Sequence, residues 1–431
     1  MENDNVLEFK TPEGEQEKGH DMLTEVLRSG AKQLLSLAVE AEVASFIEAH
    51  QQLMSDGRAR LVRNGYLPQR EVTTGIGPVE AKVPRVRDRD ESGQEKIHFE
   101  SNIIPKYLRR SGDMNELLPL LYLKGLSTGE FVEALVPIVG EKARNLSPSV
   151  ISRLKSDWAK ELETWRKQDL SKKRYVYWWA DGIYLTARME HEKQCILVII
   201  GVTDRGEKEL IAMEAGFRES KQSWLDLLRS LKQQGLKVSP ELAVGDGALG
   251  FWGAMNEEFS GTRHQRCWFH KMGNVLNLLP KSQQARAKTA LQQIWMASTR
   301  KEALEALESF CTAYKAKYPK AVENLLKDKD ELLAFYDFPA EHWASLRTTN
   351  PIESTFATVR HRTRKSKGCH SQKTIETMVF KLVQSAQKRW RRLRGFKLLA
   401  DVIKGVNFKD GTRVDNEAQA TENTNQQSCA V

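Results

Sequence analysis

The sequence lacks the features that mark secreted or membrane-inserted chains. Only five cysteines occur among the 431 residues. They are scattered, which argues against a disulfide framework and for a reducing compartment; they are Cys195, Cys267, Cys311, Cys369 and Cys429. The apolar runs, such as residues 196–202, are much shorter than the roughly 20 residues of a membrane-spanning helix. The first ten residues, MENDNVLEFK, are too polar for a secretory signal. We therefore expect a cytoplasmic protein without a membrane partner.

The composition is that of a folded, multidomain protein. Hydrophobic residues make up 40% and charged residues 29% of the chain, which excludes a disordered or fibrous class. At roughly 100–200 residues per domain, the length predicts two to four domains.

Positive charge is concentrated in two separate stretches. The net charge is +9. Residues 360–394 carry twelve lysines and arginines against one acid, and residues 58–110 carry twelve against seven acids. Charged runs are often solvated faces, but a run this one-sided is poorly explained by ion pairing along a helix. Two distant basic regions favour a protein that binds nucleic acid over a long track.

The N-terminal part is predicted to be helical with one basic β-hairpin. Apolar spacing predicts a helix over residues 20–55, turn-forming residues fill 55–75, and weak alternation over 70–87 predicts a hairpin that carries arginines. Residues 112–168 read as three short helices, the last capped by Ser147. This pattern fits a helix-turn-helix, with an ordinary helical linker as the alternative.

The middle of the chain has a different pattern. Strands are predicted at 175–188, 194–203, 209–215, 241–244 and 262–269, with helices at 221–234 and 249–259. The predicted order is therefore β-β-β-α-β-α-β. Residues 271–340 read as helical throughout, a basic helix begins near Asn350, and the polar tail after Lys409 is expected to be disordered.

Three acids stand at the ends of elements in this order. Asp181 lies in or just after the first strand, Asp246 closes the fourth, and Glu353 lies in the first turn of the basic helix. Such a chain can bring the three carboxylates together at one sheet edge. Clustered carboxylates need divalent metal, and oxygen ligands favour Mg²⁺ or Mn²⁺. Two such ions would stabilise the attacking and leaving oxygens of a phosphodiester displacement.

Each acid also has a local structural explanation. Asp181 and Gly182 could form a hairpin turn, Asp246 could cap the following helix, and Glu353 could be the partner of a cap at Asn350. The joint occurrence of all three acids, in order and beside a basic helix, favours the metal site.

Several motifs resemble those of Mutator-type transposases of bacterial insertion sequences. The similar segments, which cover roughly residues 20–400 in family order, are RNGY at 63–66, VPRVR at 83–87, LYLKGLST at 121–128, WADGIY at 179–184, VGDGA at 244–248, RCWFHKMGNV at 266–275 and TNPIES at 349–354.

The resemblance implies a fold, a reaction and a partner. The expected fold class is α/β multidomain: a ribonuclease H-like catalytic core interrupted by an all-helical insertion and preceded by helical DNA-binding domains. The implied DDE triad is Asp181, Asp246 and Glu353. The implied protein is a DNA transposase that binds the terminal inverted repeats, cleaves the element ends with two divalent metal ions, Mg²⁺ or Mn²⁺, and joins 3′-hydroxyl ends to target DNA. It would act as a homodimer or higher assembly on double-stranded DNA, in the bacterial cytoplasm at the nucleoid.

The expected domain organisation follows from both lines of reasoning. The six parts are an N-terminal helical and basic hairpin region at 1–110, a helix-turn-helix-like domain at 111–170, the first part of the core at 171–270, the helical insertion at 271–345, the Glu353 helix with basic C-terminal helices at 346–405 and a disordered tail at 406–431.

The expected DNA contacts are of two kinds. Base readout is assigned to the helix that follows Ser147, through Ser149, Ser152 and Arg153. Phosphate contacts are assigned to two basic groups; these are Arg63, Arg85 and Arg87 in the first stretch and Arg360, Arg362, Arg364, Lys365 and Lys367 in the second.

Other residues and functions are left open by the sequence. Cys267 and His270 either support the catalytic core or pack and hydrogen-bond locally, and half of a zinc site is a weaker alternative. Trp295 and Trp343 either stack on a displaced base or belong to the core. Two other functions are a non-catalytic, domesticated sequence-specific DNA-binding protein and a metal-dependent nuclease on the same fold.

Overall fold

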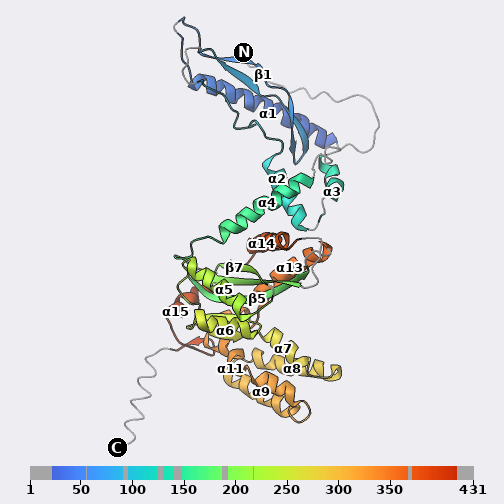
Figure 1. Ribbon diagram of the computed structural model, residues 1–431, viewed down its shortest axis with the longest axis vertical. Helices are drawn as coiled ribbons and strands as arrows, with labels where there is room; N and C mark the ends of the chain where they lie inside the picture. The colour runs from blue at the N-terminus through green and yellow to red at the C-terminus, as the bar shows by residue number, and fades with distance from the viewer. Residues whose placement is uncertain are drawn as a thin grey trace, which may run out of the picture. The chain divides into compact units, whose positions relative to one another are not determined.

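The computed structural model describes residues 22–54, 56–90, 96–124, 126, 130–139, 148–186, 193–216, 218–366 and 371–414. It is a mixed α/β protein that divides into two compact units, one up to Ile151 and one from Ser152 onward (Figure 1). Among these residues, no helix is both long and apolar enough to cross a membrane.

The first unit combines one long helix with short strands. Its elements are α1 (Met22–Ala49), β1 (Leu61–Tyr66), β2 (Arg70–Thr74), β3 (Gly77–Ala81), β4 (Pro84–Asp88), α2 (Gly112–Lys124) and α3 (Glu130–Val139). The predicted first helix is confirmed, but its buried residues are Val39 and Val43, whereas Leu34 is 68% exposed. The small core joins Val39 to Val72, Ala81, Val83 and Ile104.

Two β-ladders replace the single predicted hairpin. β2 pairs with β3 as expected, but β4 pairs with β1, so Arg85 and Arg87 lie on a second ribbon. β1 is not predicted from the sequence because Asn64 and Gly65 are typical of a turn. In the structure the ladder is irregular between Arg63 and Tyr66, and Gly65 has a φ of 66°. A glycine with positive φ inside a strand is typical of a β-bulge.

The three helices predicted over 112–168 are present as α2, α3 and α4 (Pro148–Trp165). Their connecting turns, including the capping residue Ser147, lie outside the described residues. The helix-turn-helix geometry therefore stays a prediction.

The second unit is built on a five-stranded mixed sheet. Its strands are β5 (Tyr175–Thr186), β6 (Lys193–Thr203), β7 (Lys208–Gly216), β8 (Leu242–Gly245) and β9 (Arg263–Arg266), with α5 (Lys221–Gln233) and α6 (Leu249–Glu258) between them. The predicted order β-β-β-α-β-α-β is confirmed. In space the strand order is β7-β6-β5-β8-β9; β5, β6 and β7 pair antiparallel, and β8 and β9 continue parallel to β5.

Helices cover both faces of this sheet (Figure 1). On one face, Trp178 and Leu197 of the sheet share a core with Trp224 and Leu228 of α5 and Phe251 of α6. On the other face lie α13 (Asn350–Ser366) and α14 (Gln372–Gln387), which contact β5, β6 and β7. Because side chains alternate along a strand, Asp181 points to the face opposite that of Trp178 and Ala180.

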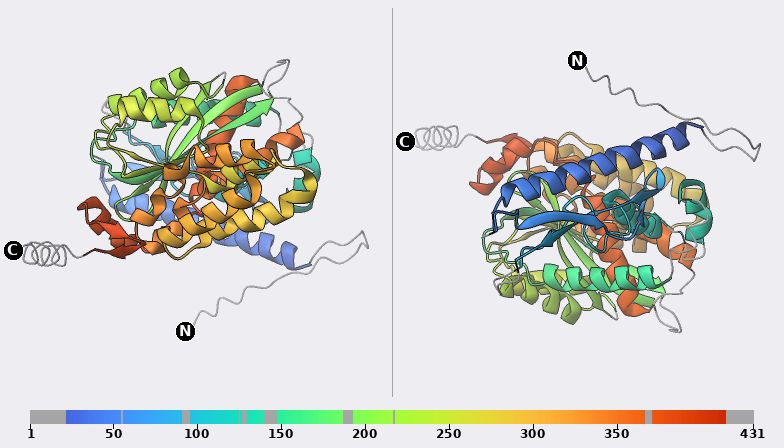
Figure 2. Two further views of the ribbon diagram at one scale, coloured as in Figure 1. Left: turned by 90° about the horizontal axis from the view of Figure 1, so that it is seen from below. Right: turned by 90° about the horizontal axis from the view of Figure 1, so that it is seen from above.

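The region from Trp268 to Leu346 is helical throughout, as predicted for residues 271–340. Figure 2 shows its yellow and orange helices packed beside one another. They are α7 (Trp268–Leu276), α8 (Lys281–Met296), α9 (Arg300–Tyr314), α10 (Pro319–Leu326), α11 (Lys329–Leu332), η2 (Ala334–Asp337), η3 (Ala340–His342) and α12 (Trp343–Leu346). Trp343 is buried and donates to Phe338 O, so it belongs to the core rather than to an open stacking surface. Trp295 is half-buried and packs on the buried Trp268, which favours the core alternative for this residue too.

The C-terminal end is ordered further than predicted. After η4 (Phe396–Leu398) and α15 (Leu399–Ile403), β10 (Phe408–Lys409) pairs with β11 (Thr412–Arg413). The expected disordered tail began at residue 406, but Phe408 is buried and Gly411 O accepts from Ala340 N–H at 3.1 Å. This corrects the tail boundary; residues 415–431 lie outside the described part of the chain.

Candidate active site

Asp181 and Asp246 lie at the same level on neighbouring parallel strands. Trp179 of β5 pairs with Val244 of β8. Two residues further along each chain lie Asp181, which is still within β5, and Asp246, which directly follows the end of β8. Strand β5 continues without a turn to Thr186, so the hairpin-turn explanation of Asp181 is wrong. Asp246 does stabilise its own loop, because its Oδ1 accepts from Ala248 N–H at 2.8 Å.

Glu353 comes to the same place from the first turn of α13. The charges of Asp246 and Glu353 both raise the pKa of Asp181, so the three carboxylates are near enough to interact electrostatically. We call this group the carboxylate site. Its three residues are half-buried, and therefore reachable from solvent.

Burial is the main reason why Asp181 is a weaker acid than an ordinary aspartate. Burial, with the neighbouring acids, raises its pKa to about 6, although the charge of His270 and the N–H of Gly182 act in the opposite direction. Gly182 N–H donates to Asp181 Oδ1 at 2.8 Å. A carboxylate held beside two others in a poorly solvated place is an unfavourable arrangement for the metal-free protein.

Glu353 is held by the residue that begins its helix. Thr349 O accepts from the N–H groups of Ile352 and Glu353, so Thr349, and not Asn350, precedes the helix. The Thr349 hydroxyl donates to Glu353 Oε1 at 3.0 Å. The predicted alternative of a cap at Asn350 with Glu353 as its partner is therefore not the arrangement seen.

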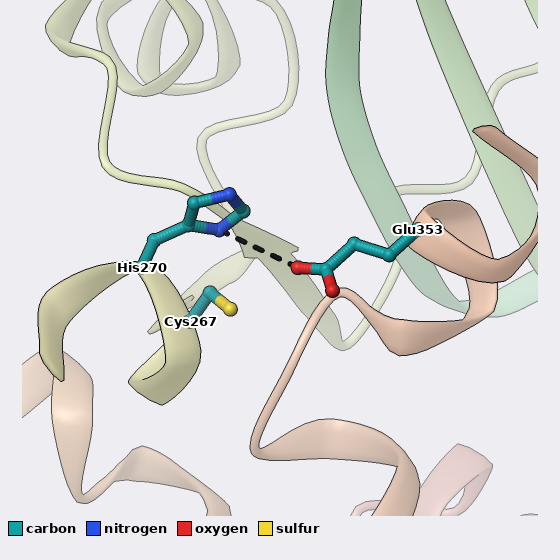
Figure 3. A group of neighbouring side chains, drawn as sticks. All are labelled: Cys267, His270 and Glu353. Carbon is teal, nitrogen blue, oxygen red and sulfur yellow. Dashed lines mark ion pairs between the residues drawn. The ribbon is translucent and has the colours of Figure 1, made fainter. Parts of the chain in front are cut away.

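Cys267 and His270 lie beside Glu353, at the start of α7 (Figure 3). Thr349 N–H donates to Cys267 Sγ at 3.3 Å, and His270 Nδ1 lies 3.8 Å from Glu353 Oε1. Both residues thus contact the segment that carries Glu353. The local alternative is also partly right, since Cys267 is fully buried.

The cysteine and the histidine each favour the charged form of the other. The hydrogen bond to Cys267 is the main cause that raises the pKa of His270 to about 9, and the charges of Asp181 and Asp246 add to it. Burial opposes ionisation of Cys267, but hydrogen bonds from His270 and Thr349 outweigh it and lower the pKa of the thiol. Their donor atoms and a Glu353 oxygen lie within 4.8 Å of one another. This donor set suits Zn²⁺, but a protonated His270 could not be a ligand.

Glu219 is a fourth acid at the site that the sequence analysis missed. It lies between β7 and α5. Burial, followed by the charges of Asp246 and Asp181, raises its pKa to about 7. An acid just before a helix is common as a partner of the helix dipole, so the sequence alone gave no distinguishing signal.

A buried ion cluster anchors α7 and was also missed. Asp328 Oδ2 lies 2.8 Å from Lys271 Nζ and 3.1 Å from Arg266 Nε. The Lys271 side chain is only 2% exposed, and burial lowers its pKa. Since Lys271 follows His270 directly, this cluster fixes the helix turn that presents His270.

The residues predicted to contact DNA from the first unit are exposed but differ in ion pairing. Arg85 and Arg87 are exposed on the same side of β4 and form no ion pair within the described part of the chain. Arg63 is exposed but already forms an ion pair with Glu40 at 2.6 Å. Because Arg63 pairs with Val86, it lies on the other side of the ribbon.

The predicted DNA contacts in the second unit are only partly described. Ser152, Arg153 and Arg360 are exposed, whereas Arg362 is 4% exposed and cannot offer its guanidinium to a phosphate in this arrangement. The side chains of Ser149, Arg364, Lys365 and Lys367 lie outside the described residues.

The fold and the site define a class: a mixed α/β protein in which acids from a central strand, a strand–helix loop and a helix interact electrostatically. Comparison with known protein families identifies the family. The chain matches the family described as "Transposase, Mutator family" over residues 3–393. It therefore belongs to the Mutator family of transposases.

Its relatives are transposases of bacterial insertion sequences. The chain is 50% identical over 279 residues to the IST2 transposase of Acidithiobacillus ferrooxidans, covering 65% of this chain and 94% of the relative. It is 48% identical over 311 residues to the IS6120 transposase of Mycolicibacterium smegmatis, covering 72% and 96%. A more distant similarity, 27% over 387 residues, links it to the IS905 transposase of Lactococcus lactis and covers 89% and 95%.

Proposed function

We propose that this chain is an insertion-sequence DNA transposase with a DDE active site made of Asp181, Asp246 and Glu353. It binds the terminal inverted repeats, cleaves the element ends by metal-dependent hydrolysis and joins 3′-hydroxyl ends to target DNA. The observation that supports the proposal is the electrostatic interaction of Asp181 with Asp246 and Glu353, which come from β5, the β8–α6 loop and the first turn of α13. The strand order supports a ribonuclease H-like core, with residues 271–345 as a helical insertion.

The residues present fit a pair of divalent cations. The donors are carboxylate oxygens, which Mg²⁺ and Mn²⁺ prefer. Burial and the charges of Asp246 and Glu353 both raise the pKa of Asp181, and positive charge would offset both effects. Asp181, Asp246 and Glu353 would hold the ions. When bound, the ions would stabilise the attacking and leaving oxygens of the phosphodiester displacement.

The surrounding residues orient the carboxylates. Gly182 N–H fixes one oxygen of Asp181, Ala248 N–H fixes one oxygen of Asp246, and the Thr349 hydroxyl fixes one oxygen of Glu353. Each acid therefore has one oxygen held by the protein, which limits its rotation before substrate binds. The positive charge of His270 offsets part of the repulsion among the acids.

DNA binding is assigned to both units. Arg85 and Arg87 of β4, and Arg360 of α13, offer exposed cations to phosphates. Ser152 and Arg153 near the start of α4 are exposed and suited to contacts with base edges. Because two element ends must be joined, we also propose a homodimer or higher assembly on DNA, acting at the bacterial nucleoid.

A strand-transfer assay tests this proposal. Purified protein, Mg²⁺, a labelled duplex carrying the element end and a plasmid target should give joined product. Asp181→Ala, Asp246→Ala and Glu353→Ala should each abolish cleavage and joining while binding to the element end is kept. Specific binding by the wild type without cutting would instead indicate a DNA-binding protein that has lost catalysis, and cutting without joining would indicate a nuclease.

A further inference from the structure

The Glu219 carboxylate occupies the space that a side chain at position 182 would fill. A Cβ built on Gly182 would lie 1.7 Å from Glu219 Oε1 and 2.6 Å from Glu219 Cδ. These distances are far below a van der Waals contact. Gly182 directly follows Asp181, and its missing side chain leaves this space to the Glu219 carboxylate, whose pKa is raised by the charge of Asp181.

Strand β5 holds Glu219 at two points. Gly182 N–H, which donates to Asp181 at 2.8 Å, also interacts with the Glu219 carboxylate. The Glu219 N–H in turn donates to the Tyr184 hydroxyl. One backbone amide of β5 thus faces two carboxylates, and the position of residue 219 is fixed along the strand.

The first turn of α6 limits movement of the same segment. A Cβ on Gly250 would lie 2.8 Å from Lys221 N and 3.3 Å from Glu219 O. This close approach leaves little room for residues 219–221 to move away from β5. Glu219 is therefore held between Gly182 of β5 and Gly250 of α6.

Helix capping does not account for this placement. The N-terminus of α5 is already capped by Ser220, whose hydroxyl accepts from Ser223 N–H at 3.1 Å. In the described part of the chain, no lysine or arginine forms an ion pair with Glu219. The neighbouring charged groups are Asp181, Asp246 and His270, two of which repel it.

We propose that Glu219 is a fourth carboxylate of the divalent-metal site, admitted and positioned by Gly182. The inference rests on the proposed function, because it adds a residue to the metal site assigned there. A metal ion beside Asp181 would add to the positive charge of His270 and offset the repulsion of Glu219 by Asp181 and Asp246. A glycine is then required at position 182, because any side chain there would displace the Glu219 carboxylate.

Metal-dependent thermal stabilisation of the full-length protein without DNA tests this directly. Mn²⁺ and Mg²⁺ are titrated against the wild type, Glu219→Gln, Asp181→Asn and the control Glu257→Gln. Glu257 is an exposed acid of α6 that pairs with Lys221 and Arg229. We expect Glu219→Gln to raise the Mn²⁺ concentration for half-maximal stabilisation by about 10-fold or more, and Glu257→Gln to leave it unchanged.

A second pair of variants separates the steric role from the metal role. Gly182→Ala should lower the melting temperature and weaken the metal response, because its Cβ collides with Glu219. Gly182→Ala combined with Glu219→Ala should recover the melting temperature but not the metal response. Recovery of the metal response in the double variant would overturn the inference.

The two proposals fail in distinguishable ways. If Glu219→Gln responds to metal like the wild type while Asp181→Asn does not, Glu219 is not part of the site and the proposed function stands. If Asp181→Asn also responds like the wild type, both the carboxylate metal site and the role of Glu219 are overturned.

Discussion

Thr349 offers the sharpest test of how Glu353 is held. Thr349→Val removes the hydroxyl that donates to Glu353 Oε1 at 3.0 Å and keeps the branched shape of the side chain. A hydrogen bond to a charged group contributes about 1.5–3 kcal/mol. The Glu353 side chain is 24% exposed, so water replaces part of the lost bond, and we take the lower limit. If the bond orients Glu353 during cleavage, about 1.5 kcal/mol corresponds to a roughly tenfold lower rate.

The assay is single-turnover cleavage of a labelled element end at saturating Mg²⁺. Thr355→Val is the matched control, because Thr355 is a buried residue of the same helix whose hydroxyl donates to Pro351 O at 3.2 Å and does not touch Glu353. Both variants should lose a similar, small amount of stability, and only Thr349→Val should lose rate. Equal rates for the two variants would refute the orienting role of Thr349.

Two further predictions concern stability. Asp328→Asn should lower the free energy of unfolding by about 3 kcal/mol, because it leaves the buried cations of Lys271 and Arg266 without their anion. Lys271→Met should lower the free energy of unfolding much less. Equal losses for the two variants in denaturant unfolding would contradict the prediction. Asp88, whose side chain is 3% exposed, accepts hydrogen bonds from Arg60, and these hold its pKa well below the usual range. Its stabilising contribution is therefore present above an unfolded-state pKa of about 4 and is lost as pH falls below that value; unfolding followed from pH 6 to pH 3 should weaken less in Asp88→Asn than in the wild type.

The sheet was predictable because its strands differ clearly in their apolar pattern from the neighbouring segments of the sequence. Residues 196–202 form a continuous apolar run and became the central part of β6. The buried face of α5, with four leucines and one tryptophan, has a clear helical period. The ladder of β1 with β4 was not predictable, because Asn64 and Gly65 have the same local signal in a turn and in a bulge. α1 was found from its periodicity, but which side of it is buried depends on distant strands.

The carboxylate site was only partly predictable for a related reason. Asp181 lies in a recognisable strand, Asp246 follows another and Glu353 begins a helix, so topology alone could suggest that they meet. Glu219 and Asp328 lie in connecting segments whose position is decided by packing. In particular, the contact of Glu219 with Gly182 depends on where the β7–α5 turn falls, which no local pattern encodes.

The geometry at Glu353 is set by the sheet, although a long helical region separates this residue from Asp246. The segment that leads from the helical region to Glu353 is hydrogen-bonded to β5. The Tyr177 hydroxyl bonds to His342 Nδ1 at 2.8 Å, and Trp179 Nε1 donates to Ser345 O at 2.9 Å.

The same return is then tied to the start of α7. Trp268 N–H donates to Arg347 O at 2.9 Å, and Thr349 N–H donates to Cys267 Sγ at 3.3 Å. Four contacts within eight residues therefore fix the entry into α13 before Glu353 is reached. Because all four partners belong to the sheet or to residues directly after it, changes confined to α8–α10 can alter stability or DNA contacts without moving Glu353 relative to Asp181.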